Sequence, residues 1–264
     1  MPVTRVFGWP YERPDADQPG VTLHGGLDGS HPILAEEIER DVARLLTGFR
    51  FLQRVIYTES GSFVKANYPG LRMVRVVCQA GGGAGGGAVA TSSSERSAGR
   101  GGGGGEYAES WLPADILPST VTVTVGAGGE GVPGAEGLPG GDSSFGTLVV
   151  ARGGPGGVVS TGTGNTGSAG TSGGTGGVGD LLIPGGEGGG VHRNSGANLA
   201  ISGEGGNSVL GHGGKMRIPG STYFVGSPGT GYGGGGGGAA NLTSQSASVG
   251  GDGAPGIVIV DIYV

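Results

Sequence analysis

The chain closes with Gly250-Gly-Asp-Gly-Ala-Pro-Gly256 and Ile257-Val-Ile-Val-Asp-Ile-Tyr-Val264, which follow the glycine tract Gly231-Tyr-Gly-Gly-Gly-Gly-Gly-Gly238. The last eight residues are mostly β-branched and contain neither glycine nor proline. They therefore predict a strand that is buried on both faces and central in a sheet. The preceding glycines continue neither a strand nor a helix readily, because glycine loses the most backbone entropy on ordering. Strong strands that alternate with long glycine-rich segments are the expected plan of the whole chain.

Glycine supplies 68 of the 264 residues, whereas its usual share is roughly 7%. One interpretation is low complexity, with glycine and serine tracts that stay flexible. The other is an ordered domain, since segments of Val, Ile, Leu and Tyr between the tracts supply apolar surface for a thin core. Composition alone is compatible with both.

The formal net charge is -6, and the 15 Lys and Arg residues are scattered along the chain. Nucleic acid and anionic membranes are therefore not expected as partners. A single cysteine, Cys78, excludes an intrachain disulfide, and its valine neighbours predict a buried thiol. Residues 1–20 lack a signal-peptide pattern and no apolar run approaches 18 residues, so we expect synthesis in the cytoplasm and no membrane insertion.

Residues 1–30 are rich in Pro, Gly and Asp, and such a segment cannot bury itself. They form either a frayed terminus or an extended arm. In the second case the arm docks onto a neighbouring protein through its aromatic side chains, Phe7, Trp9 and Tyr11.

A helix is predicted from His31 to about Phe51, within a segment assigned to residues 31–54. Pro32 suits its first turn, and acidic residues favour its positive end. Apolar residues repeat with spacings of three and four and form a heptad seam, at Ala35, Ile38, Val42, Leu45, Phe49 and Leu52. An isolated helix of this length is marginal in water, so the seam needs a partner. The partner is either the chain's own sheet or, as we expect, identical chains in a homotrimer.

Residues 55–264 are expected to form a glycine-rich β domain. Strands are predicted at 55–57, 63–65, 71–79, 107–112, 120–125, 144–151, 180–183 and 257–264, the cleanest being the Val and Thr alternation of Thr120–Val125. Residues 131–140 carry glycine at every third position, which gives a polyproline II strand a bare face for another backbone. The predicted fold class is mainly β: a β-sandwich-like head with polyproline II-like glycine tracts, preceded by one N-terminal α-helix.

An ordered set of motifs resembles the glycine-rich domains of bacteriophage tail fibres and minor tail proteins, similar in role to tail-tip adhesins. The resemblance covers about residues 58–264, and its motifs are Ser60–Phe63, Gly101–Glu109, Val121–Gly129, Gly140–Gly146 and Gly250–Val260. It implies a structural virion component that contributes to host attachment. It also implies stacked polyproline II strands that present variable loops, although the full β-strands of this chain depart from a pure polyproline II fold.

The sequence offers possible catalytic and metal-binding residues, but the residues around them do not support either role. Gly170-Thr-Ser-Gly-Gly174 satisfies G-x-S-x-G but lacks the strand before it and the helix after it that a nucleophile elbow needs. The histidines have no metal-ligand spacing: His24, His31, His192 and His212. We therefore expect no enzyme activity, no metal and no cofactor.

The leading hypothesis is a trimeric phage tail fibre or tail-tip protein, located in the virion. Its arm would bind other tail or baseplate proteins, and its head would bind a host-surface glycan or protein. The alternative is a bacterial cell-surface or matrix protein with elastic glycine tracts, and a third hypothesis is a surface-degrading enzyme of the fibre. Candidate receptor-binding residues are His192, Arg193, Tyr223, Phe224 and Tyr232. The competing interpretation makes Tyr223–Val225 another buried strand and places His192 and Arg193 in an ordinary loop.

Overall fold

The computed structural model describes residues 3–6, 9–12, 50–220 and 223–264. They fall into two units, Met1–Phe49 and Arg50–Val264. In the first unit, strands β1 (Val3–Val6) and β2 (Trp9–Glu12) pair as an antiparallel hairpin. No helix among the described residues is long and apolar enough to cross a membrane.

The N-terminal end of the second unit corrects the expected helix boundary. Strand β3 spans Phe51–Tyr57, so residues 51–54 are extended and Leu52 lies in a strand instead of a helical seam. The reason is that β3 pairs antiparallel with the C-terminal strand along its length, which satisfies its backbone groups there. The rest of the predicted seam, from Ala35 to Phe49, lies outside the described residues.

A five-stranded sheet has the order β13-β7-β5-β20-β3. Its other members are β5 (Met73–Gln79), β7 (Tyr107–Pro113), β13 (Leu181–Ile183) and β20 (Ile257–Tyr263). Strand β20 pairs with β3 on one side and β5 on the other, and most of its residues are buried. The predicted interior position of the C-terminal strand is confirmed.

A four-stranded sheet, order β10-β9-β8-β4, packs against the first. Its strands are β4 (Gly61–Val64), β8 (Thr120–Thr124), β9 (Ser143–Phe145) and β10 (Val149–Ala151), and short 3-10 helices lie at Lys65–Asn67 and Ala114–Ile116. In β8 the valines are buried and the threonines exposed, as their alternation predicts. One core includes side chains from both sheets, among them Phe63, Val76, Val123, Phe145, Val258 and Val260.

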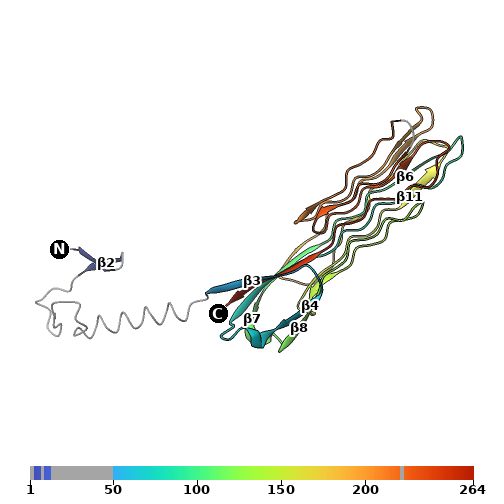
Figure 1. Ribbon diagram of the computed structural model, residues 1–264. Coiled ribbons are helices and arrows are strands. Elements are labelled where there is room, and N and C mark those ends of the chain that lie inside the picture. Colours follow the sequence, from blue (N-terminus) through green and yellow to red (C-terminus); the bar gives the residue numbers. More distant parts are fainter. Residues whose placement is uncertain (1–2, 7–8, 13–49, 221–222) are drawn as a thin grey trace, which may run out of the picture. The chain divides into compact units, whose positions relative to one another are not determined.

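Beyond these sheets, glycine-rich segments lie side by side (Figure 1). Residues 80–88 show how they are joined, because successive N–H groups donate to three different segments in turn and the order then repeats. The donor and acceptor pairs are Ala80 to Glu106, Gly81 to Gly141, Gly82 to Ala254, Gly83 to Gly103, Ala84 to Leu138 and Gly85 to Gly251. A repeat of three residues per turn, with every bond made to another segment, is the geometry of polyproline II strands.

Three oligoglycine tracts form the interior of this arrangement: residues 80–88, 99–106 and 233–239. The first donates to three segments, and its carbonyls accept from three others, at 126–131, 152–158 and 233–239. The other two interior tracts are likewise hydrogen-bonded to segments all around them. We call the set the glycine lattice, comprising 80–88, 99–106, 126–131, 137–141, 152–158, 170–177, 185–190, 202–207, 213–217, 226–229, 233–239 and 249–256.

The lattice requires glycine because its backbones touch. A Cβ built on Gly86 would lie 2.7 Å from the carbonyl oxygen of Val158 and 2.9 Å from that of Gly157. On Gly102 and Gly236 it would overlap the carbonyl groups of Gly83 and Gly251. Glycine here therefore permits close packing of ordered backbones, and the interpretation of these tracts as flexible linkers is wrong for this structure.

The run at residues 131–140 does not form one straight strand. It turns back at Pro133–Gly134, where Gly134 has a φ of 67°. The expected principle holds on both sides of this turn, since a Cβ on Gly137 or Gly140 would overlap the interior tract and one on Gly131 would overlap the carbonyl group of Gly250. The predicted strand 144–151 is also divided, because Gly146 with a φ of 57° forms a turn between β9 and β10.

Consecutive lattice segments run in opposite directions, so their turns gather at two ends (Figure 1). The two large sheets and the pair β16 (Gly211–His212) and β18 (Thr230–Gly231) lie at one end. The other end, here called the tip, carries the turns at 89–95, 132–135, 162–166, 194–199 and 242–247. Its strands are β6 (Arg96–Gly99), β11 (Val159–Gly162), β12 (Thr166–Gly167), β14 (His192–Asn194), β15 (Leu199–Ile201), β17 (Tyr223–Phe224) and β19 (Ala240–Asn241).

The tip has a small core of its own. Its strands form a sheet of order β11-β6-β19-β17 and a sheet of order β12-β14-β15. Small and aliphatic side chains fill the space where they meet: Ala98, Val191, Ala200, Ala240 and Leu242. The tip turns are therefore supported by packed strands as well as by the lattice.

Candidate functional site

The structure places the predicted receptor-binding residues at both ends of the lattice. Tyr223 and Phe224 form β17 at the tip and are exposed, by 53% and 40% respectively. The alternative of a buried strand is therefore wrong. The guanidinium carbon of Arg217 lies 5.7 Å from the centre of the Phe224 ring, a cation–π distance.

Tyr232 does not join them. It follows β18 in the turn at the end that carries the large sheets, and Ser208 donates a hydrogen bond to its carbonyl. The next residue, Gly233, donates to Pro255 O just before β20. Tyr232 and Tyr223 thus lie at opposite ends of one lattice segment, so the candidate receptor-binding residues do not form one surface.

His192 and Arg193 belong to β14 at the tip, not to a loop. His192 is exposed, but Arg193 is only 4% exposed and packs between the two tip sheets. Its Nη2 donates to Ser160 Oγ over 3.2 Å, whereas its Nε and Nη1 have no hydrogen-bond partner among the described residues. Burial lowers the pKa of Arg193. Strand alternation turns this side chain inward, so its guanidinium is not presented to a receptor.

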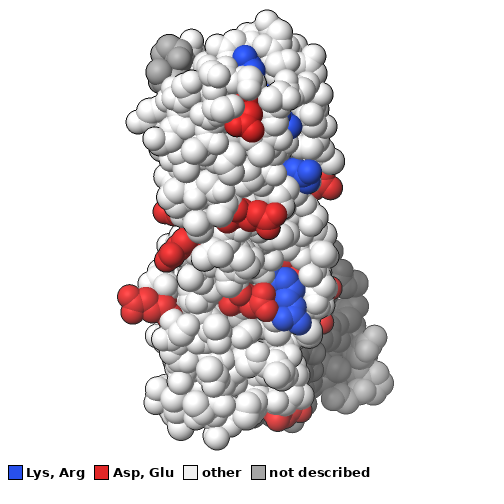
Figure 2. Space-filling view, turned by 90° about the vertical axis from the view of Figure 1, so that its right-hand side faces the viewer, with Lys and Arg blue, Asp and Glu red and all other residues white. Residues whose placement is uncertain are grey.

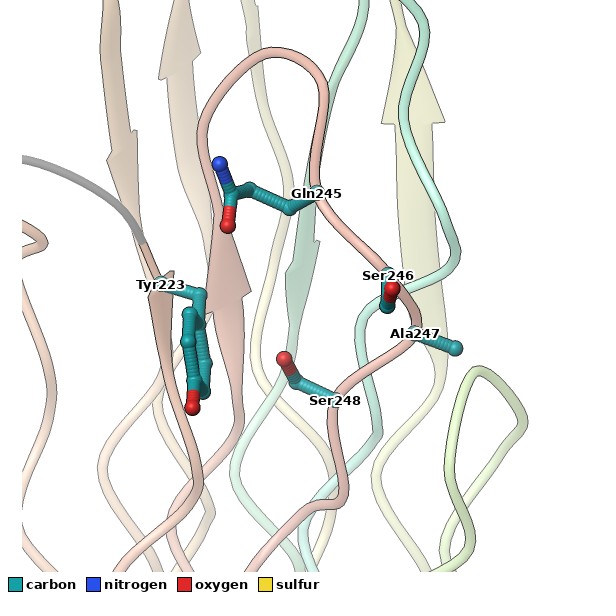
Figure 3. A pocket seen from close by; sticks show the side chains of 5 residues that line it. All are labelled: Tyr223, Gln245, Ser246, Ala247 and Ser248. Carbon is teal, nitrogen blue, oxygen red and sulfur yellow. The ribbon is translucent and has the colours of Figure 1, made fainter.

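A groove of about 250 Å³ opens beside Tyr223 (Figure 3). Its other lining residues come from the polar turn that precedes the last lattice segment: Gln245, Ser246, Ala247 and Ser248. Figure 3 shows the Gln245 side chain extending toward the Tyr223 ring and the methyl group of Ala247 pointing away from it.

Asn241, which is fully buried, fixes this turn. Its Nδ2 donates to Val89 O over 3.0 Å and to Ser246 O over 2.7 Å, and its Oδ1 accepts from Ser248 Oγ over 2.6 Å. Charge-free networks in which a buried amide is satisfied on both atoms hold a unique geometry. The groove is therefore lined by a turn whose backbone is already in place.

Thr91, which lies in the neighbouring turn at 89–95, holds the 242–247 turn in place through hydrogen bonds. Its N–H donates to Gln245 O over 2.9 Å, and the Gln245 N–H donates to Thr91 Oγ1 over 3.0 Å. The Thr91 hydroxyl also donates to Leu242 O. Two turns that are far apart in the sequence thus form one rigid rim beside the groove.

Several polar groups of the groove remain available. Gln245 Nε2 donates to Thr243 O over 3.2 Å. Within the part of the chain that the structure describes, Gln245 Oε1, Ser246 Oγ and the Tyr223 hydroxyl make no hydrogen bond. These groove residues were not predicted from the sequence, apart from Tyr223. The sequence feature that could have indicated them is the mainly polar run 241–248, which lies between two glycine tracts.

The charged groups of the large sheets are internally paired. Asp261 accepts from Arg54 Nε over 2.6 Å, and Arg75 Nε donates to Glu109 Oε1 over 2.6 Å. Hydrogen bonds from these arginines lower the pKa of both carboxyl groups. This ladder spans neighbouring strands and stabilises the sheet, and nothing about it indicates catalysis.

Other reactive groups are likewise structural or dispersed. Cys78 is fully buried, as predicted, and burial raises its pKa to about 12. Among the described residues no three His, Cys, Asp or Glu side chains are placed so that they could hold a metal ion together. Figure 2 shows Lys and Arg side chains separated by uncharged surface on the face that it presents.

These observations define a class of protein: a mainly β domain built on backbone-packed glycine segments, with a polar, aromatic tip. The family model of the Glycine-rich domain matches residues 58–263, and the chain belongs to this family. Comparison with the curated proteins gives no match.

Proposed function

We propose that this protein is a structural component of a bacteriophage virion, a tail fibre or tail-tip protein that contributes to host-surface recognition. It is not an enzyme, and it works by holding the tip turns in a fixed arrangement. The family membership supports the glycine-rich part of the resemblance from which this proposal starts.

One observation carries the proposal. The glycine lattice is an ordered support in which the interior glycines leave no room for a Cβ, while the tip turns differ from one another in length and composition. Binding groups on a rigid support lose little conformational entropy when a ligand binds. A constant support with varied turns suits a surface that must change its specificity without changing its fold.

The same observation disfavours the alternative of an elastic cell-surface or matrix protein. Elastic glycine tracts would need backbones that are free to extend. In the lattice the backbone N–H groups of the interior tracts bond to neighbouring segments at 2.8–3.0 Å. Extension would break many of these bonds together.

Attachment to the particle and association of three chains are assigned to the N-terminal segment that precedes β3, residues 1–50. The exposed apolar side chains that follow it support this assignment. Phe51 and Ile56 of β3 and Trp111 of β7 are each about half exposed on the five-stranded sheet. Neighbouring copies would cover such side chains and the free edge of β3.

The test is electron microscopy of negatively stained virions from the phage that encodes this chain, with a gold-labelled antibody raised against residues 50–264. We expect gold at the tail fibre or tail tip. Label on the surface of uninfected bacteria, with none on virions, would favour the matrix protein. Release of sugars or peptides from host envelopes by the purified chain would instead support the enzyme.

A further inference from the structure

We infer that the groove between Tyr223 and the 242–247 turn is a subsite for a neutral sugar ring. The inference rests on the proposed function, because it names the chemical class that the tip recognises. Its test nevertheless needs only the purified protein.

The first argument is the aromatic side chain. Tyr223 is 53% exposed although it lies in a paired strand, β17, next to β19. A large exposed ring beside a groove offers an apolar face and a polar tip to a ligand. The C–H face of a sugar ring matches such a surface, whereas an anionic group does not.

The second argument is the hydrogen-bonding set opposite the ring. Gln245 Oε1 is an acceptor, and the hydroxyls of Ser246 and Tyr223 are donors and acceptors; none of these atoms is used within the described residues. A sugar hydroxyl both donates and accepts, so it pairs with all three. Ser248 differs, because its hydroxyl is already donated to Asn241.

The third argument is the absence of charge and the rigidity of the rim. Every side chain that lines the groove is uncharged. An acidic sugar or a phosphate would find no cation among them, so the lining favours a neutral ring. Because Asn241 and Thr91 already fix the turn, binding does not have to order it.

The experiment is saturation-transfer NMR of the full chain with methyl glycosides of glucose, galactose, mannose, rhamnose, N-acetylglucosamine and N-acetylgalactosamine. We expect at least one of them to bind with a Kd of about 1 mM, as suits a single ring in an open groove. The Y223A variant should weaken that binding by about tenfold or more, and S246A by severalfold. The Y223W variant should retain it.

The matched control is Y232A, which removes a half-buried tyrosine at the opposite end of the lattice and should leave binding unchanged. Melting temperatures of all variants identify any that fail to fold. If Y223A does not fold, the test rests on S246A. The inference is overturned if no glycoside binds, or if binding survives both Y223A and S246A. Gold-labelled virions without sugar binding would refute this subsite alone, whereas sugar binding without labelled virions would refute the proposed function alone.

Discussion

Replacing one interior glycine by alanine tests whether the lattice is packed as described. Gly85 lies in the first interior tract, and its N–H donates to Gly251 O over 2.8 Å. A Cβ there would lie 2.8 Å from Gly238 N and would overlap the carbonyl group of Gly237. Neither neighbour is a flexible side chain, so the backbones themselves must separate.

The cost follows from two effects. Overpacking of a dense interior typically costs about 1–3 kcal/mol. Separation of the tracts also lengthens the bonds that hold them, and one buried backbone group left without a partner costs about 1–3 kcal/mol more. We therefore expect G85A to lower the free energy of unfolding by about 2–6 kcal/mol, which in a chain of this size corresponds to a fall of roughly 10 °C in Tm.

The matched control is G164A. Gly164 lies in a tip turn, and a Cβ there would have no atom within 4 Å. That substitution should be neutral or stabilise by up to about 1 kcal/mol, because alanine restricts the unfolded chain. Thermal and urea unfolding followed by circular dichroism measure both variants. Equal stability of G85A and G164A would refute the packed lattice.

Three further predictions concern the rest of the chain. Hydrogen bonds from Arg54 lower the pKa of Asp261, so this carboxylate stabilises the fold above about pH 4, and the stabilisation is lost as the pH falls through the lowered pKa. When urea unfolding is measured between pH 2 and 6, the free energy of unfolding of D261N should depend less steeply on pH than that of the unmutated protein. An equally steep pH dependence in both proteins would contradict the ladder. Burial raises the pKa of Cys78 to about 12, so the native protein should not react with a thiol reagent at pH 8 until it is unfolded, and rapid native labelling would count against the buried position. The predicted seam makes the chain a trimer by light scattering that V42D and L45D dissociate, whereas a monomer for the unmutated protein would end this hypothesis.

The strands were largely predictable because their side chains report their environment. Thr120–Thr124 alternates valine and threonine, and Ile257–Tyr263 is apolar on both faces, as its interior position requires. Cys78, which follows Val76 and Val77, was correctly predicted as buried. In each case local sequence and tertiary packing favour the same structure.

The lattice was only partly predictable, because glycine carries no side chain that identifies a neighbour. The sequence could predict backbone-to-backbone packing of tracts such as 81–87, but not which segments they contact. Those contacts depend on hydrogen bonds between residues as distant as Gly82 and Ala254. For the same reason the sequence did not indicate that the run at 131–140 turns back at Pro133–Gly134, because its period of three continues through that turn.

The site was less predictable still. The groove joins Tyr223 to a polar turn about twenty residues later, and its geometry depends on Asn241 and Thr91, which no local motif marks. Arg193 and Tyr232 carry groups that suit receptor binding. However, strand alternation turns Arg193 inward, and the path of the chain places Tyr232 at the end of the lattice opposite the tip.

Site-directed blocking of the two ends tests the central claim, that the tip is the surface that contacts the host. Single cysteines replace Ala197, exposed in a tip turn, or Asp115, exposed at the opposite end, and each is coupled to a maleimide polymer while buried Cys78 stays unmodified. Binding of each product to host cells is then measured by flow cytometry. We predict that the polymer at A197C abolishes binding and that the polymer at D115C leaves it intact; binding that persists with the tip blocked would contradict the account.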